Sequence, residues 1–565
     1  MKPPVTSLLH TAMIGLCLTS GAHAAFQIAF PPVPVTTWTA VADTGFPAPD
    51  KYIPGGHVTA FTDFSPPVIG GGGTGFSFPP RITFKGKMTV AAPVTVADDE
   101  GIWSNGDPIT WTNPLGPTMW MVAQEGDSIG GVTLGKSNSM PVRALQNAIY
   151  GGTLFTTSSN LSPPLFNLSV YEGGSLNGVA GNGVGFFTGG GRAVTDGTRI
   201  AAWAQSGPID GTLFWDINAT LGWPHTLTNG IYRWLPTSNP RVPCSPAISE
   251  YGGVAHRAHN TALPWFRQNF IQADPKIPGG FFPAPVTVVQ QNDLAQVSER
   301  FGIFHPILMA ITGGPNIAPT VAWQMSNLYT DTGSSATLGK VIPGSKSLWC
   351  WRQLSTITPY AQIAREGAAA TDITGGRTFK SFYALHLVDD NTNWPDSDVF
   401  YGVILDNGKT AIYTRHITTF AGTTTVLAPE QLIATDDPGG PLLQRVPAIY
   451  GGTFPIAKLF AWFSVDLQGN VLIKATLGGT VPPGQAQCLI AAMSGTSNHA
   501  MVMRAQSDPT VFSLPTLSHG PQAITGFDIT NPEQGPLGRG QGISGSTIGA
   551  VINFTGPDKG VYYGQ

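Results

Sequence analysis

Apolar and polar positions alternate along this chain in short runs that turn residues separate. Val471–Ala475 and Arg199–Ala204 are two such runs. Alternation with a period of two over four to eight residues predicts β-strands. Asp406-Asn407-Gly408 lies between two apolar runs and predicts a hairpin turn. No stretch has an amphipathic helical pattern over three turns, so we expect an all-β fold with little or no helix.

Further strands are expected near both ends and in the middle of the chain. Asn229–Trp234 and Glu100–Trp103 have the character of additional outer strands of a sheet. Gly560–Tyr563 is expected to be a strand that closes the fold.

Two features repeat along the sequence. The hexapeptide Ala148–Thr153 returns letter for letter as Ala448–Thr453, 300 positions later. A shorter pattern, hydrophobic-Ala-x-(acid or Thr)-Gly, has imperfect copies, which we call the turn signature. The copies are Val41–Gly45, Val122–Gly126, Val289–Asp293, Ile363–Gly367, Ile433–Asp437 and Met503–Ser507.

The spacing of the turn signature predicts the architecture. Successive copies are 70 to 81 residues apart except for one interval of 167, which must hide a degraded unit. Three or four strands in each unit are typical of a β-propeller. We expect about seven blades, with six to eight open, in a single domain that spans 25–565. The predicted units begin near 41, 122, 205, 289, 363, 433 and 503.

The repeat also carries a family resemblance. Gln124-Glu125-Gly126-Asp127 and Arg365-Glu366-Gly367 resemble the REGD-like turn of bacterial extracellular tandem-repeat proteins of the choice-of-anchor type. Asp466–Ile473 loosely resembles the NxxGxxAF-like strand of their units, with Asp in place of Asn. The resemblance spans most of the chain in degenerate form. It implies a secreted β-repeat protein and carries no catalytic residue across.

The first residues have the features of an export signal. Lys2 precedes a short apolar run, and Ala22-His23-Ala24 is a small-x-small cleavage site. We therefore expect 1–24 to be removed and the mature protein to be extracellular or periplasmic. No later apolar run reaches the length of a transmembrane helix, so we expect no transmembrane segment.

Composition agrees with a folded, turn-rich protein. The chain has 70 Gly and 49 Pro, while charged residues are 11% of the total. The net charge of −4 gives no electrostatic footprint for nucleic acid. Cys244, Cys350 and Cys488 remain after the signal, and either one disulfide or three buried thiols fit this count, with buried thiols slightly favoured.

Carboxylates recur at the turn signature. Asp side chains bond the backbone of turns, so we interpret these residues as structural. The recurring residues are Asp43, Asp127, Asp293, Asp436, Asp437 and Asp508.

Other acids lie outside the turn signature and are the candidates for chemistry. Asp389, Asp390, Asp396 and Asp398 form an oxygen-rich loop, a candidate calcium site and the only cofactor site that we expect. His256 and His259 are three apart in a predicted strand, which disfavours zinc. Glycosidase acids need to be some 5 to 10 Å apart, and the loop acids could supply them. The candidates are Asp98, Asp99, Glu100, Asp389, Asp390, Asp396 and Asp398.

Two functions follow from these observations. The first is a non-enzymatic binding module whose partner is a polysaccharide or an envelope protein. The second is a glycan-active propeller enzyme, either a glycoside hydrolase or a lyase, that uses loop carboxylates. No HExxH pattern occurs in the sequence, and Gly542–Ser546 misses the nucleophile-elbow pattern at its last position, so the first function is preferred.

Overall fold

The structure is a computed structural model that describes most of the chain from residue 38 onward. The described residues are 38–49, 57–70, 81–104, 119–129, 132–134, 143–147, 153–158, 166–172, 175–178, 189–195, 199–206, 209–216, 231–237, 246–249, 253–259, 263–274, 286–314, 317–389, 396–427, 430–440, 445–447, 453–466, 469–480, 486–492, 499–504, 522–530, 542–544 and 547–564.

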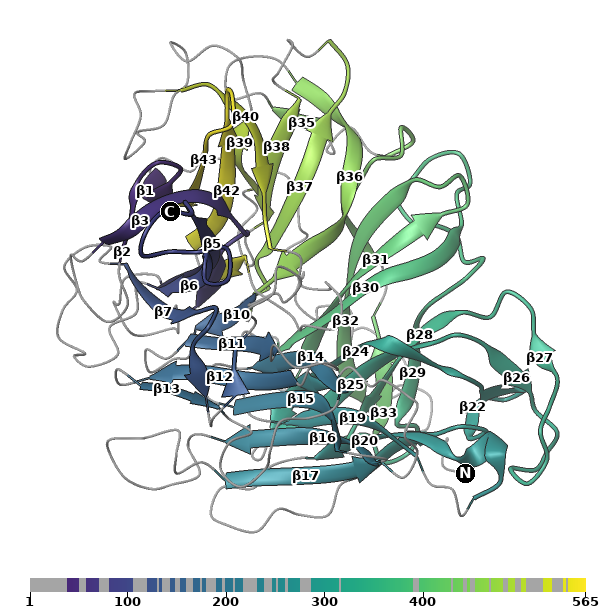
Figure 1. Ribbon diagram of the computed structural model, residues 1–565. Coiled ribbons are helices and arrows are strands. Elements are labelled where there is room, and N and C mark those ends of the chain that lie inside the picture. The colour runs from purple at the N-terminus through teal and green to yellow at the C-terminus, as the bar shows by residue number, and fades with distance from the viewer. Residues whose placement is uncertain are drawn as a thin grey trace, which may run out of the picture.

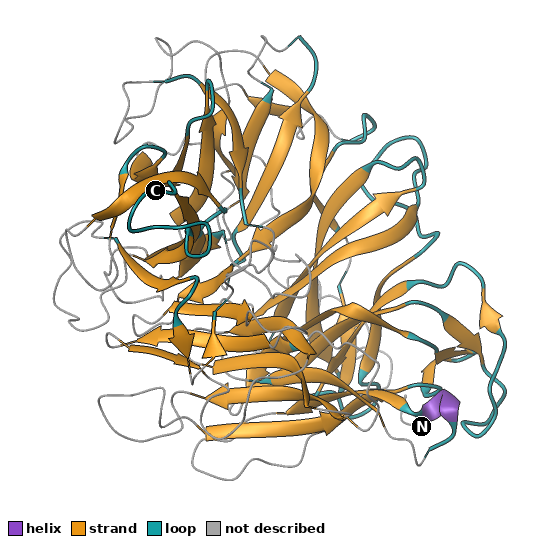
Figure 2. Ribbon diagram, in the orientation of Figure 1, coloured by secondary structure: helices purple, strands orange, loops and turns teal. Residues whose placement is uncertain are grey.

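The fold is all-β. Strands dominate the described residues, and the helical content there is one 3-10 turn, η4 (Trp265–Arg267) (Figure 2). The predicted hairpin is confirmed: its two strands end at Leu405 and begin at Thr410, and Gly408 between them has a φ of +80°. Glycine adopts this left-handed conformation without steric cost.

The described residues contain nine antiparallel sheets of four or more strands. Eight of them follow one another along the chain, and we number these eight in chain order. The first four sheets are built from local strands. Sheet 1 contains β2 (Pro47–Pro49), β3 (His57–Phe64), β4 (Val68–Gly70), β5 (Arg81–Met88), β6 (Glu100–Ser104) and β7 (Trp120–Gln124). Sheet 2 contains β10 (Arg143–Asn147), β11 (Thr153–Ser158), β12 (Phe166–Glu172) and β13 (Ser175–Gly178). Sheet 3 contains β14 (Gly189–Thr195), β15 (Arg199–Ser206), β16 (Ile209–Asp216) and β17 (Ile231–Thr237). Sheet 4 contains β18 (Ala247–Ile248), β19 (Val254–His259), β20 (Asn269–Asp274) and β21 (Val286–Gln290).

The next four sheets continue the same order, and the last one takes in the first strand of the chain. Sheet 5 contains β24 (Phe304–Gly314), β25 (Ile317–Met325), β28 (Ser347–Arg352) and β29 (Tyr360–Arg365). Sheet 6 contains β30 (Phe379–Asp389), β31 (Ser397–Leu405), β32 (Thr410–Phe420), β33 (Thr423–Val426) and β34 (Gln431–Thr435). Sheet 7 contains β35 (Arg445–Pro447), β36 (Thr453–Val465), β37 (Val471–Leu477), β38 (Gln487–Ala492) and β39 (His499–Arg504). Sheet 8 contains β40 (Ile524–Asp528), β41 (Ile543–Ser544), β42 (Thr547–Phe554), β43 (Lys559–Gly564) and β1 (Trp38–Asp43).

Two smaller elements extend this series. A hairpin of β8 (Ser128–Ile129) and β9 (Val132–Thr133) follows sheet 1. A second element, which we call the small sheet, is inserted around sheet 5 and protrudes from it (Figure 1). The small sheet contains β22 (Leu294–Gln296), β23 (Glu299–Phe301), β26 (Leu328–Thr330) and β27 (Val341–Ile342).

Contacts between the sheets lead around a closed path. Each sheet contacts the next one along the chain, and sheet 8 contacts sheet 1 through β42 and β4. The purple first strand lies beside the yellow last strands in Figure 1, where β1 pairs with β43 in antiparallel register from Trp38 opposite Gly564. The closing strand that was predicted for Gly560–Tyr563 is therefore confirmed.

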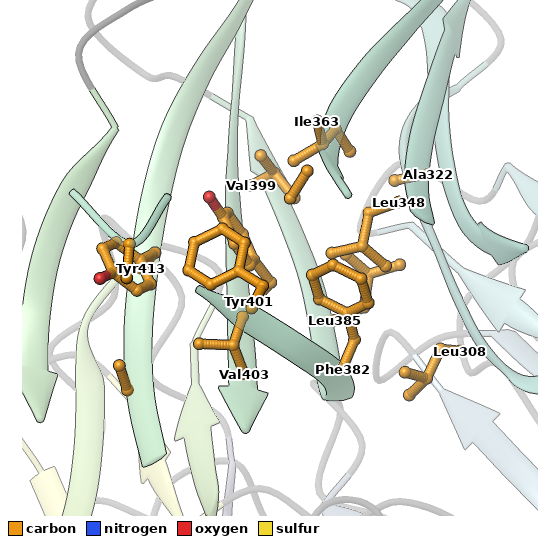
Figure 3. Packing of buried hydrophobic residues seen from close by; sticks show 14 of the residues in the cluster. Leu308, Ala322, Leu348, Ile363, Phe382, Leu385, Val399, Tyr401, Val403 and Tyr413 are labelled. Atoms are coloured by element: carbon orange, nitrogen blue, oxygen red, sulfur yellow. The ribbon is translucent and has the colours of Figure 1, made fainter. Parts of the chain in front are cut away.

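The hydrophobic core lies between neighbouring sheets. Leu308 and Leu348 of sheet 5 pack with Leu385, Val399 and Tyr413 of sheet 6 (Figure 3). Similar clusters join sheets 4 and 5, 6 and 7, 7 and 8, and 8 and 1. Each sheet of these pairs thus buries a face against the next, which a single sheet could not do alone.

Both sequence repeats have defined places in this arrangement. The two AIYGGT copies connect equivalent strand pairs, because Asn147 lies opposite Thr153 and Pro447 opposite Thr453. The turn signature begins in the last strand of its sheet in β1, β7, β21, β29 and β34. Two further sheets, which end in β13 and β17, lie in the long interval, whereas one hidden unit was expected there, starting near 205.

One expected position was wrong. Glu100–Trp103 was expected to form an outer strand, but β6 lies between β5 and β7. β7 occupies the outer position instead, because it pairs with β6 and lies at the edge of the sheet. Asn229–Trp234, by contrast, overlaps β17, the last strand of sheet 3, as predicted.

Candidate functional site

The signature turns share one hydrogen-bond pattern. In five of them the fourth residue donates its backbone N–H to the carbonyl of a residue at the start of the neighbouring strand of the same sheet, or just before it. These bonds are Thr44 to Lys559 (2.9 Å), Glu125 to Glu100 (3.0 Å), Gln291 to Asn269 (2.9 Å), Glu366 to Lys346 (2.8 Å) and Asp436 to Thr410 (3.2 Å). The turn therefore ties the last strand of a sheet to its neighbour at one end.

This pattern corrects the alignment of one copy. Gln291 occupies the fourth position, and Asn292 takes the place of the glycine with a φ of +70°. The copy therefore begins at Val288, one residue earlier than the sequence suggested. Asn is the residue that most readily replaces Gly in a left-handed conformation, so the turn survives without its glycine.

The recurrent Asp residues have backbone partners, in agreement with the structural interpretation. Asp127 accepts from the N–H of Gln124 at 2.9 Å, and Asp293 accepts from that of Gln290 at 2.9 Å. Asp436 accepts from the N–H of Thr410 at 2.6 Å and Asp437 from that of Gly439 at 2.6 Å. Asp43 is buried, and Asp508 lies outside the described residues.

Glu125 departs from this pattern. Its side chain is 2% exposed, and its Oε1 atom has no hydrogen-bond partner within the described part of the chain. Burial, reinforced by the nearby charge of Glu100, raises the pKa of Glu125 to about 8, and Lys85 opposes this shift. A carboxyl whose pKa lies near neutrality can exchange a proton under working conditions.

The acids beside Glu125 are those that the sequence nominated. Lys85 forms an ion pair with Glu100, and Lys87 forms one with Asp99 at 3.2 Å. Asp99 is 2% exposed, and its Oδ1 has no partner among the described residues. Asp98 instead accepts the N–H of Thr95 at 2.5 Å. We call Lys85, Lys87, Asp99, Glu100 and Glu125 the acid cluster of sheet 1.

The predicted calcium loop has a different environment. Asp396 and Asp398 flank the ring of His416, with Nδ1 at 2.9 Å from Asp398 and Nε2 at 3.2 Å from Asp396. Arg352 reaches from sheet 5 to Asp396 at 3.1 Å and is 1% exposed. Asp389 is buried at the end of β30, and Asp390 lies outside the described residues. Calcium at this loop stays a prediction, and within the described residues no group of three or more such side chains is arranged to hold a metal ion.

The charges of this second cluster are fixed around neutral pH. Burial alone would lower the pKa of His416, but hydrogen bonds and the charges of Asp396 and Asp398 raise it to about 9. Burial would raise the pKa of Asp396, yet hydrogen bonds from His416, Thr418 and Arg352 hold it below its ordinary value. His416 therefore stays protonated and Asp396 ionised, so neither is suited to proton transfer at pH 7.

A third carboxyl escaped the sequence analysis. Glu430 precedes β34 and is 8% exposed, and it accepts hydrogen bonds from the hydroxyl of Tyr401 and from that of Thr371 at 3.3 Å. Burial raises its pKa to about 8. It lies in the core between sheets 5 and 6, away from solvent, so we assign it a structural role. Its distant partners, 29 and 59 residues away, could not be found from local sequence patterns.

The remaining sequence candidates have simple outcomes. His256 and His259 belong to β19, which confirms the predicted strand. Cys350 and Cys488 are buried, and Cys244 lies outside the described residues. The described residues include no helix with the length and hydrophobicity to cross a membrane.

Comparisons with known proteins give no family. No family model matches the sequence, and no curated protein matches it. A puromycin-hydrolysing peptidase of Mycobacterium tuberculosis is similar over 92% of this chain and 61% of its own, with 12% identity and a TM-score of 0.32. A puromycin hydrolase is similar over 87% and 59%, with 12% identity and a TM-score of 0.30. The extracellular domains 1-2 of Drosophila Semaphorin 1b are similar over 80% and 87%, with 9% identity and a TM-score of 0.27.

These sequence identities and TM-scores are too low to support an argument about function. This chain spans about three fifths of the length of the two hydrolases.

Proposed function

We propose that the protein is an exported β-propeller of eight blades that binds a ligand without transforming it. Each of the eight sheets is one blade in this proposal. The observation that carries it is the closed path of contacts in which sheet 8 contacts sheet 1 and takes its outer strand from the start of the chain. Pairing of the two chain ends in one blade closes a ring without leaving free sheet edges between blades.

The number of blades lies at the upper end of the range that the sequence predicted. The interval of 167 residues holds two additional sheets, and the turn signature is degenerate in both. Negative-stain images of the purified chain should resolve a ring with eight blades. Class averages of an open arc or of two separate bodies would contradict the ring.

Export is part of the proposal and rests on the first 24 residues and on the resemblance to extracellular repeat proteins. Mature protein recovered from outside the cytoplasm should begin at Ala25. Protein that keeps Met1 and stays in the cytoplasm would contradict export.

Binding is preferred to catalysis because the available acids are engaged elsewhere. The acids of the signature turns bond backbone N–H groups, and Asp396 and Asp398 are held by His416. Glu430 accepts hydrogen bonds from the hydroxyl groups of Tyr401 and Thr371. A ring of blades can present loops for recognition without any reactive group.

One observation favours the alternative, a glycan-active enzyme. Glu125 combines a pKa of about 8 with an unpartnered oxygen, and Glu100 and Asp99 lie close enough to raise that pKa. A protonated carboxyl beside an ionised one is the pair that glycoside hydrolysis needs. In this alternative Glu125 would be the general acid, and Glu100 or Asp99 the second carboxylate.

A binding screen separates the two functions. Purified 25–565 is offered immobilised polysaccharides, and envelope proteins in a second arm. Retention of the protein on one ligand, with that ligand recovered intact, is the expected result. Cleavage of any polysaccharide in the panel would favour the enzyme.

A further inference from the structure

Trp265 is far more exposed to solvent than the tryptophans of the core. Trp103, Trp323 and Trp349 are at most 1% exposed and fill the spaces between sheets, whereas Trp265 is 63% exposed. It lies on η4, the helical turn that leads into β20 of sheet 4 (Figure 2). An indole left in water loses the stabilisation that its burial would give, so this ring has no evident role in the core.

The turn that carries Trp265 is held in place from several sides. The N–H of Arg267 donates to the carbonyl of Pro264 at 2.7 Å, and the side chain of Gln268 donates to that of Leu263 at 2.9 Å. The ring of Phe266 meets the indole edge-on at a centroid distance of 5.6 Å. The exposed ring thus has a rigid base, which lowers the entropy that a ligand would lose on binding.

Two reciprocal hydrogen bonds connect this turn to the signature turn of sheet 4. The guanidinium of Arg267 donates to Oε1 of Gln290 at 2.7 Å, and Nε2 of Gln290 donates to the carbonyl of Arg267 at 2.8 Å. Arg267 also lies 3.4 Å from Asp293. The side chains of Arg267 and Asp293 remain 25% and 30% exposed, so both are accessible to a ligand.

Sheet 1 contains the same connection without the tryptophan. Nε2 of Gln124 donates to the carbonyl of Asp98 at 2.7 Å, just as Gln290 bonds Arg267. Asp98 and Arg267 both lie two residues before the strand that pairs with the last strand of their sheet, so Trp265 corresponds to Val96, which is 59% exposed. The loop therefore forms with a small apolar residue at this position. The fold therefore does not require an indole at this position.

Two exposed apolar side chains of the small sheet are separated from each other by buried residues. Leu294 and Val341 are exposed at opposite edges of the small sheet, but between them Arg300 and Tyr329 are 7% and 4% exposed. Asn292 holds the loop that follows β26 through the carbonyls of Ser335 and Thr337. Leu294 and Val341 are thus separated from each other and form no continuous docking face.

An exposed indole on the same turn as a partly exposed guanidinium, which pairs with a carboxylate, suits a sugar ring. The C–H face of a pyranose can lie on the electron-rich face of the indole, while its hydroxyl groups bond charged side chains. We propose that Trp265, Arg267 and Asp293 form a binding site for one sugar ring of a polysaccharide. This inference rests on the proposed binding function and specifies the class of ligand.

The test uses the full mature chain and matched variants. Binding to immobilised dextran, xylan, alginate and chitosan is measured for the wild type, Trp265→Val, Trp265→Phe and Phe420→Ala. Trp265→Val installs the residue of the equivalent loop in sheet 1. Phe420 is 65% exposed at the end of β32 and controls for the loss of an exposed aromatic ring. Thermal unfolding verifies that every variant is folded.

The expected result is binding to at least one polysaccharide that falls by about tenfold or more in Trp265→Val, as for a central aromatic contact. Trp265→Phe should retain part of the affinity, and Phe420→Ala should retain all of it. Wild-type affinity in Trp265→Val would overturn the sugar site and leave the binding function intact. Binding of an envelope protein, with no polysaccharide bound, would also overturn the sugar site and leave the binding function intact. Cleavage of the polysaccharide would instead overturn the proposed function.

Discussion

Glu125 and Gln291 occupy the same position in two signature turns, and only one of them has a partner for its side chain. Both are almost fully buried, at 2% and 3% exposure. Oε1 of Gln291 accepts a hydrogen bond from Asn269 at 3.1 Å, whereas Oε1 of Glu125 has no partner among the described residues. The same backbone turn thus accommodates an amide in sheet 4 and a carboxyl in sheet 1. The carboxyl makes the stability of sheet 1 depend on pH.

Replacement of Glu125 by Gln should flatten this dependence. The folded-state pKa of about 8 lies above the ordinary value of 4.5, so the folded protein keeps a proton that the unfolded chain releases between these values. The free energy of unfolding therefore falls as pH rises from 4.5 to 8. At pH 9, Glu125→Gln should be more stable than the wild type by about 1–3 kcal/mol, because no buried charge is left unpaired.

Urea unfolding at pH 5, 7 and 9 measures this effect. Glu366→Gln changes the equivalent, less buried position of sheet 5 and is the matched control. An identical pH slope in Glu125→Gln and the wild type would contradict the assignment.

The cluster around His416 should lose its stabilisation at a higher pH. The folded-state pKa of about 9 lies above the ordinary 6.5, so its contribution is fully present below pH 6.5 and disappears as pH rises through 9. His416→Ala should lower the free energy of unfolding by about 1.5–3 kcal/mol at pH 6, since it leaves the partly buried carboxylate of Asp396 with fewer partners. The loss should be smaller at pH 10. An equal loss at both pH values would refute the charged form of His416.

Calcium at the predicted loop would compete with this imidazolium. The ion would need oxygens of Asp396 and Asp398 that now face the two ring nitrogens of His416. We therefore predict that millimolar calcium raises the melting temperature of His416→Ala more than that of the wild type. Asp398→Asn in the same background should abolish the rise. No calcium effect in either protein would remove the loop as a metal site.

The glycine of the signature turn can be tested by the residue that replaces it in sheet 4. Gly367 has a φ of +82°, and a Cβ at this position would meet nothing within 4 Å, so any cost of substitution is conformational. Gly367→Ala should cost about 1–2 kcal/mol. Gly367→Asn should cost less, because Asn292 adopts this conformation naturally. Chemical unfolding of both variants gives the comparison, and a larger cost for Asn would contradict the equivalence of the two turns.

Local patterns predicted much of the fold. The alternating run at Val471–Ala475 lies within β37, the turn around Gly408 is a hairpin, and Gly560–Tyr563 closes the last sheet. The turn signature predicted the repeat because its residues bond their own and neighbouring strands. These features depend on residues close together in sequence, where period and turn chemistry are visible.

The candidate site was harder to predict because its contacts join distant segments. Arg352 meets Asp396 across two sheets and 44 residues, and Arg365 pairs with Glu299 across 66. The repeat in sheets 2 and 3 was inferred only from the long interval, and the number of units there stayed open, because the turn signature is degenerate in both sheets. The sequence singled out the acids as a set, but their partners and burial decide their roles, and neither can be read from spacing.

The central claim is that this ring of sheets binds a polysaccharide and leaves it intact. The most direct measurement follows new reducing ends over time while the protein is saturated with the polysaccharide that it retains. We predict that the bound polysaccharide is recovered at its original length, with no reducing ends above the protein-free control. Reducing ends that accumulate in proportion to protein and time, and that disappear in Glu125→Gln, would contradict it and make the acid cluster of sheet 1 an active site.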